Sequence, residues 1–157
     1  MKTLKQYLES LNACPDAIEW AGDKPIEQVV TECHRGDWLL WLANRCNVEL
    51  QPLTLAKALC ANTVRHLMTD ERSVKAVDVA IAFGEGRATR DELDAAAATA
   101  TANAAAAYAA YAATAAAASA AYAAVDTNQQ QTADICRKYI GDLIIQKVNQ
   151  QLNPTNP

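Results

Sequence analysis

The stretch from Ala95 to Val125 constrains the fold of this chain more than any other segment. About two thirds of its residues are alanine, and it contains no charged residue, no glycine and no proline. Alanine is the best helix former, because it loses no side-chain entropy on folding and has no polar group to bury. We therefore predict one continuous helix from about Thr89 to Val125, roughly 35 residues long and spanning about 50 Å.

Capping patterns define the expected ends of this helix. Thr89 can act as the N-cap, and Glu92 completes a capping box three residues later. A polar run begins directly after the alanine stretch and is expected to end the helix. The last helix should then follow over about 128–152, with Thr127 and Gln130 as its own capping box. A short turn between two long helices makes them antiparallel.

Apolar residues earlier in the chain recur at spacings of three and four, which predicts a series of shorter helices. We expect these helices over 3–11, from Pro15, from Pro25 to a stop at His34, over 38–46, over 52–68, and from a cap at Asp70 or Ser73 to Gly84. Asp37 is the natural N-cap of the 38–46 helix, and Gly36 offers a left-handed C-cap position to the helix before it. The side chains expected to face inward include Ile26, Val29, Val30 and Cys33 in one helix and Val74, Val77, Ala80 and Ile81 in another.

These patterns together predict an all-α fold, since no segment shows the alternation of a strand. The expected architecture is a helical bundle around the long alanine-rich central helix, which forms an antiparallel hairpin with the C-terminal helix. We expect a single helical domain over residues 1–152 and a disordered tail over 153–157.

Charge and composition narrow the expected partners and location. The net charge of −4 argues against nucleic acid as a partner. We expect no membrane span, because no run is long and apolar enough, and a cytoplasmic location, because the N-terminus does not resemble a signal peptide. The five cysteines include no CxxC pair and are expected to be reduced, buried and small hydrophobic residues. No metal or other cofactor is expected, since the two histidines lack ligand spacing to a cysteine pair.

The few large side chains of the alanine stretch allow three interpretations. Tyr108, Tyr111 and Tyr122 fall on one side of the predicted helix. They can fill gaps between packed helices, or they can line a ligand groove. Asn103 and Thr114, eleven residues apart, resemble the spacing of type I antifreeze proteins, which implies ice binding. A helix of this length with no charged side chain also exposes apolar surface beyond a compact monomer, so we predict a homodimer or higher oligomer.

Two further groups of residues are candidates for binding. Arg35 and Asp37 flank a tight turn, where they can form a cap and a salt bridge or bind a ligand. Asp134, Arg137 and Lys138 share one face of the last helix. If that face meets the tyrosines, a cation beside aromatic rings would suit a nucleotide or another anionic small molecule. His34 and His66 show no spacing to a cysteine or serine, so no catalytic set is predicted.

Several segments together resemble a known family. They are Asn12-Ala13-Cys14, Glu19-Trp20-Ala21-Gly22, the run from Cys33 to Leu42 that includes GDWLLWL, and Ala133 to Ile140 after the alanine- and tyrosine-rich stretch. This arrangement resembles immunity proteins of the Imm5 type, which occur in bacteria and in many phage genomes. The resemblance implies an all-α protein that protects a cell or a phage by binding, and it implies no catalytic residues.

The sequence therefore predicts a small binding protein that is not an enzyme and that neutralises a partner protein, a toxin or a defence component, as an immunity or phage anti-defence protein. The alternative is a phage-type sponge that sequesters a nucleotide immune signal in a tyrosine-lined pocket. The candidate binding residues are Arg35, Asp37, Trp38, Trp41, Tyr108, Tyr111, Tyr122, Asp134, Arg137 and Lys138.

Overall fold

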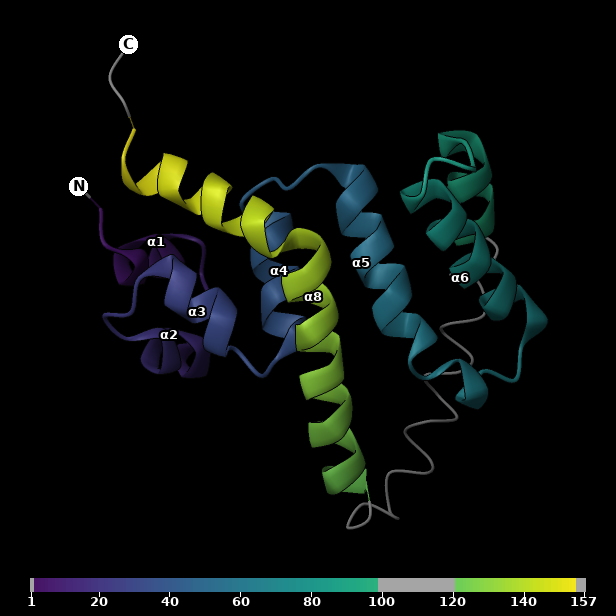
Figure 1. The fold of residues 1–157 in the computed structure, drawn as a ribbon, viewed down its shortest axis with the longest axis horizontal. Helices are drawn as coiled ribbons and strands as arrows, with labels where there is room; N and C mark the ends of the chain where they lie inside the picture. The colour runs from purple at the N-terminus through teal and green to yellow at the C-terminus, as the bar shows by residue number, and fades with distance from the viewer. Residues whose placement is uncertain (1, 99–120, 155–157) are drawn as a thin grey trace.

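The structure is a computed structural model that describes residues 2–98 and 121–154, with only the backbone described for 121–127. All regular elements in these residues are helices, which confirms the all-α prediction (Figure 1). They are α1 (Leu4–Ser10), α2 (Pro15–Ala21), α3 (Ile26–Glu32), α4 (Gly36–Arg45), α5 (Leu50–Asn62), a 3₁₀ turn η1 (Arg65–Leu67), α6 (Glu71–Gly84), a helix over 90–98, and α8 (Ala121–Leu152).

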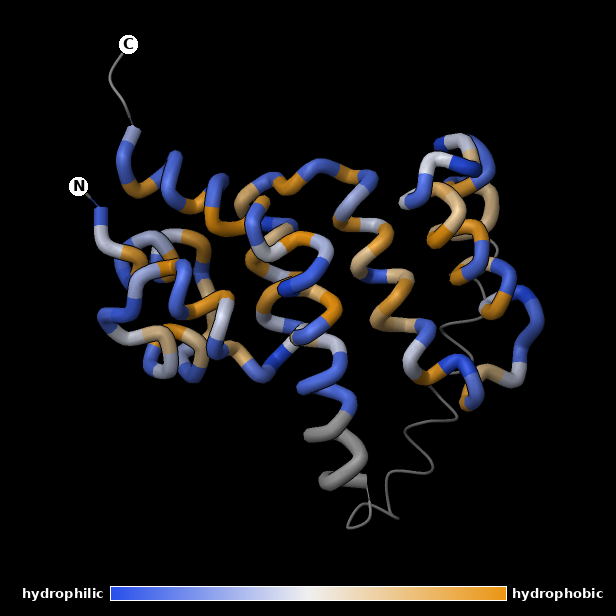
Figure 2. Tube along the Cα trace, viewed as in Figure 1, coloured by the Kyte–Doolittle hydropathy of each residue, from blue (hydrophilic) through white to orange (hydrophobic). Residues whose placement is uncertain are grey.

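Helix α8 lies at the centre of the described bundle. It packs against α1, α3, α4 and α5. Its buried residues recur every three or four positions, which places them on one face: Ala133, Cys136, Ile140, Ile144 and Val148. Figure 2 shows hydrophobic residues concentrated where α4, α5 and α8 meet. The predicted hairpin and the predicted self-association depend on the alanine-rich residues 99–120, which lie outside the described residues.

The boundary predicted between the last two helices is wrong. Helix α8 begins at Ala121 and continues through Thr127, so there is no turn after the alanine stretch, and Thr127 lies within the helix and not at its start. The alanines before Thr127 have high helix propensity, and they extend the helix through a polar run that would otherwise end it. The other predicted capping box is confirmed, because Thr89 N–H donates to Glu92 Oε2 at 2.7 Å and Glu92 N–H donates to Thr89 Oγ1 at 3.2 Å.

The start of α4 also differs from the prediction. The helix begins at Gly36, with Arg35 at the N-cap position, so Asp37 lies in the first turn and is not the cap. Gly36 is not a left-handed C-cap, since the glycines with positive φ are Gly22 and Gly86 among the described residues. Gly36 is buried against Thr132 of α8, and a Cβ added there would lie 2.6 Å from the Thr132 carbonyl carbon. Its role is therefore to let two helix backbones approach closely.

The prediction of one helix over 52–68 is wrong, because this range is divided between α5 and η1. Helix α5 ends at Asn62, where Thr63 Oγ1 donates to the Cys60 carbonyl at 2.7 Å, and η1 follows. Asp70 is confirmed as the N-cap of α6, since it accepts from Arg72 N–H at 2.8 Å. Of the four α6 residues expected to face inward only Val77 is buried, because α6 packs mainly on α5.

The inner face predicted for α3 is confirmed, with Ile26, Val29, Val30 and Cys33 all buried. Four of the five cysteines are buried thiols as expected, but Cys14 is exposed because it precedes α2 at the surface. None of the described helices has the length and apolar character needed to cross a bilayer.

Candidate functional site

A cavity of about 590 Å³ lies among α1, α2, the end of α3 and α4. We call it the Trp pocket, because three tryptophans contribute to its wall. It is lined by Leu8, Asn12, Ala13, Cys14, Ala17, Trp20, Ala21, Val29, Cys33, Arg35, Asp37, Trp38, Leu39, Trp41 and Leu42. An apolar cavity with a few polar groups at its edge is the usual form of a binding site.

The tryptophans at this pocket come from two helices. Trp20 lies on α2, and Trp38 and Trp41 lie three residues apart on α4, so they share a face of that helix. The ring centroids of Trp20 and Trp38 are 6.0 Å apart. His34 completes a cluster with centroid distances of 6.1 Å to Trp20, edge to face, and 6.5 Å to Trp38. All three tryptophans are half-buried, so each presents part of its ring to solvent.

A cation lies over each of the paired indole rings. Lys24 Nζ is 4.1 Å from the Trp20 ring centroid and donates to the Trp20 carbonyl at 2.7 Å. Arg35 Cζ is 4.6 Å from the Trp38 ring centroid. Cation–π contacts of this kind favour one orientation of the ring. The rings are therefore held in place before any ligand arrives.

Arg35 is also bonded to Asp37 at the edge of the pocket. Its Nε and Nη2 donate to the two carboxylate oxygens at 3.0 and 2.6 Å. The hydrogen bonds from Arg35 hold the pKa of the Asp37 carboxyl below its ordinary value, and they raise the pKa of Arg35. Both groups stay charged near neutral pH, which gives the apolar pocket a polar edge.

The structure brings four of the predicted binding residues together in the Trp pocket: Arg35, Asp37, Trp38 and Trp41. The sequence analysis did not include Trp20, His34 or Lys24 among the candidate binding residues. The segment Glu19-Trp20-Ala21-Gly22 was part of the family resemblance, and that was the one signal pointing to Trp20. Spacing could not show the contact, because α2 and α4 are separated by another helix.

The predicted group on the last helix has a different environment. Arg137 Nη1 donates to the Cys33 carbonyl at 2.6 Å and to the Val30 carbonyl at 3.5 Å, and Arg137 also pairs with Asp134. Its guanidinium therefore caps the C-terminal end of α3. Asp134 and Lys138 line a separate groove between α5 and α8, where Lys138 Nζ lies 5.1 Å from the Tyr139 ring centroid.

The nucleotide hypothesis also involves the three tyrosines of the alanine stretch. Tyr108 and Tyr111 lie outside the described residues. Tyr122 lies in the first turn of α8, and its side chain also falls outside the described part. The sponge alternative therefore stays a prediction.

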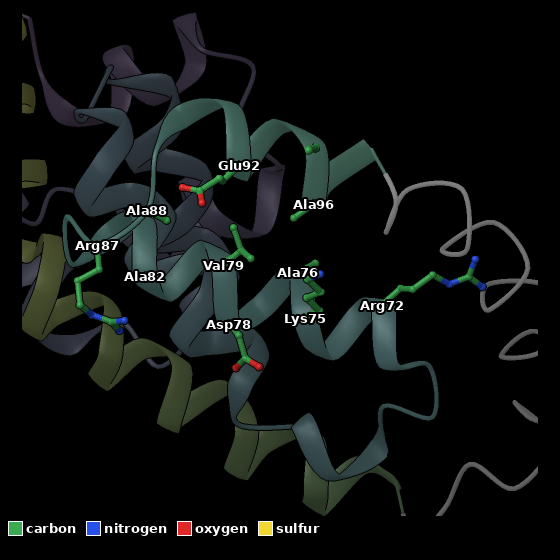
Figure 3. Close-up of a pocket in the computed structure, with 11 residues that line it drawn as sticks. Arg72, Lys75, Ala76, Asp78, Val79, Ala82, Arg87, Ala88, Glu92 and Ala96 are labelled. Carbon is green, nitrogen blue, oxygen red and sulfur yellow. The ribbon is translucent and has the colours of Figure 1, made fainter.

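A second cavity, of about 790 Å³, lies between α6 and the helix over 90–98 (Figure 3). Figure 3 shows Ala76 and Val79 on α6 opposite Ala96 of the second helix. The carboxylate of Asp78 is bonded to Arg65, with Nη2–Oδ2 at 2.9 Å, and that of Glu92 caps its own helix at Thr89. These two acids are therefore used in local structure, and we consider the Trp pocket the better candidate.

The described residues contain no group of three histidine, cysteine, aspartate or glutamate side chains placed to hold a metal ion. Comparisons of this chain with protein-family models, with curated proteins and with solved structures found no match.

Proposed function

We propose that this chain is a binding protein that neutralises a partner protein, as an immunity or phage anti-defence protein does, and that the partner contacts the Trp pocket. The observation that carries this proposal is the pair of half-buried tryptophans, Trp20 and Trp38, held in contact from two helices beside an apolar cavity. Tryptophan and arginine are the residues most enriched among those that dominate protein–protein binding energy.

The surroundings of the two rings support this use. Lys24 and Arg35 already hold the indoles, so binding would cost little side-chain entropy. The apolar cavity can receive one apolar side chain of the partner, while the Arg35–Asp37 pair supplies the polar rim that surrounds such contacts. We place this function in the cytoplasm, which suits five cysteines that are all thiols.

A comparative pull-down tests the proposal. The tagged full-length chain is expressed in cells that naturally carry the gene, and the bound protein is identified by mass spectrometry and measured by calorimetry. Trp20→Ala and Trp38→Ala should each weaken binding by about 30-fold, the effect of losing a dominant contact. Tyr139→Ala is the matched control, since it removes a ring that is 38% exposed on α8 away from the pocket.

The circular dichroism and thermal unfolding of each variant establish that it is folded. Partner binding that survives both tryptophan substitutions would refute the assignment of the Trp pocket. A wild-type chain that carries a nucleotide in native mass spectrometry, and no protein partner, would refute neutralisation of a protein and favour the sponge alternative.

A further inference from the structure

Two cysteines from distant parts of the chain lie in contact inside the bundle. Cys60 of α5 and Cys136 of α8 are 76 residues apart in sequence, and their Sγ atoms are 4.0 Å apart. Cys60 is 8% exposed and Cys136 is fully buried. Both are thiols, and among the described cysteines they are the two whose sulfur atoms contact each other.

The backbones around this pair are also close. Cys60 Sγ lies 3.7 Å from the Thr132 carbonyl oxygen, and Cys136 Sγ lies 3.7 Å from the Gly36 carbonyl oxygen. Helices α4, α5 and α8 therefore meet at the thiols, with Gly36 allowing the close approach. A disulfide needs an S–S distance of about 2.05 Å, so the two sulfurs must move together by about 2 Å. Bond formation therefore requires rotation about the side-chain bonds of both cysteines and a small shift of α5 against α8.

We propose that Cys60 and Cys136 are an oxidisable pair, which hydrogen peroxide converts into a disulfide that joins α5 to α8. In the first step the Cys60 sulfur attacks one peroxide oxygen, the O–O bond breaks, and a sulfenic acid and one water form. In the second step the Cys136 sulfur attacks the Cys60 sulfur, the S–O bond breaks, and a second water leaves. Two thiols and one peroxide thus give one disulfide and two waters.

The environment assigns the order of these steps. Cys60 is the one of the two with any solvent exposure, so a small oxidant reaches it first. The hydrogen bond between the two sulfurs lowers the pKa of Cys60 below its ordinary value, and the same bond together with burial raises the pKa of Cys136. The thiolate is the reactive form of cysteine, which makes Cys60 the attacking group.

The other buried cysteines provide the contrast. Cys33 Sγ donates to the Arg35 carbonyl at 3.4 Å, and Cys46 Sγ donates to the Ala43 carbonyl at 3.6 Å. Burial raises the pKa of both thiols, that of Cys46 to about 11. Neither has a second sulfur in contact with it, so neither can complete the second step.

The test uses the full-length folded chain exposed to hydrogen peroxide at neutral pH, followed by alkylation of the remaining thiols in denaturant. In the expected product Cys60 and Cys136 have each lost a hydrogen atom and carry no alkyl group, and peptide mapping links Cys60 to Cys136. The thermal midpoint should rise by roughly 5 °C or more, because the bond closes a long loop in the unfolded chain, and should return on reduction.

Two variants sharpen this test. Cys60→Ala should abolish the cross-link, and Cys46→Ala, which removes a buried thiol without a sulfur neighbour, should leave it unchanged. The proposal is overturned if wild-type protein gives sulfinic acid without a cross-link, if the disulfide joins other cysteines, or if it forms only after unfolding. Since the peptide map is made on wild-type protein, the result does not depend on whether a variant folds.

Discussion

The helices on the two sides of α8 are buried to different extents. On one side, α1, α3 and α4 contribute a continuous set of buried apolar residues that includes Leu4, Ile26 and Leu39. On the other side α5 belongs to the same core, whereas α6 contributes Val77 alone, and its Val74, Val79 and Phe83 are half-buried. Figure 1 shows the reason, since α3 and α4 lie against α8 whereas α6 lies beyond α5.

This difference indicates where the chain tolerates change. Helices α4 and α8 each pack against further helices. A residue between them cannot move without disturbing the whole core, because protein interiors are close-packed. A helix such as α6, which contributes one buried residue to the protein interior, can shift with less disturbance. We therefore expect matched substitutions to cost more free energy of unfolding on the α4 side of α8 than on α6.

The largest effect is expected at Gly36, one of two glycines at tight helix crossings. Gly36→Ala would place its Cβ 2.6 Å from the Thr132 carbonyl carbon, between α4 and α8. We expect a loss of about 3 kcal/mol in the free energy of unfolding, which exceeds the gain of roughly 0.5–1 kcal/mol in helix propensity. Gly84→Ala would place its Cβ 2.8 Å from the Leu55 Cα, but Gly84 is the last residue of α6.

Because α6 can move away from α5, we expect Gly84→Ala to cost about 1 kcal/mol. Urea unfolding of both variants, followed by tryptophan fluorescence, measures the difference. Equal losses at the two glycines would show that the two sides are equally rigid, and the comparison would fail.

A smaller effect is expected at the arginine that joins α8 to α3. Arg137→Ala leaves the carbonyls of Val30 and Cys33 without their donor at the end of α3, which should cost about 1–3 kcal/mol. Arg65 on the other side pairs with Asp78 at the surface, so Arg65→Ala should change the midpoint of urea unfolding less. Lys138→Ala is the control for removing a neighbouring charge, and a loss equal to that of Arg137→Ala would contradict the capping role.

Local patterns were read correctly where nothing competed with them. The capping box of Thr89 with Glu92 and the cap at Asp70 are made by residues within three positions of each other, so spacing was sufficient. The prediction for Asp37 failed because α4 already begins at Gly36, which places Asp37 in the first turn of the helix.

Contacts between distant residues account for most of what the sequence could not show. Spacing along one helix placed Trp38 and Trp41 on a shared face, but the ring contact with Trp20 depends on how α2 meets α4. The Cys60–Cys136 contact depends likewise on the crossing of α5 with α8. The position of one helix on another is set by the whole core and leaves no local signal.

The smallest expected effect concerns acid stability at the edge of the Trp pocket. Hydrogen bonds from Arg35 lower the pKa of Asp37 in the folded protein, and those from Arg65 lower the pKa of Asp78. A carboxyl with a lowered folded-state pKa stabilises the protein above its unfolded-state pKa, and this stabilisation is lost as the pH falls through the folded-state value. Each wild-type carboxylate should therefore contribute to a fall in stability below about pH 4.

Asp37→Asn should make that fall shallower in urea unfolding measured at pH 7, 5 and 3, since the amide does not titrate. We expect Asp78→Asn to change the fall in stability less. Arg35 is held by the face of Trp38, so it gives up less side-chain freedom in pairing with Asp37 than Arg65 does in pairing with Asp78. Arg35 and Arg65 have similar exposure, 32% and 38% for their side chains, so a difference in arginine exposure does not account for this contrast. A larger change for Asp78→Asn would mean that the stacked arginine adds nothing to the ion pair.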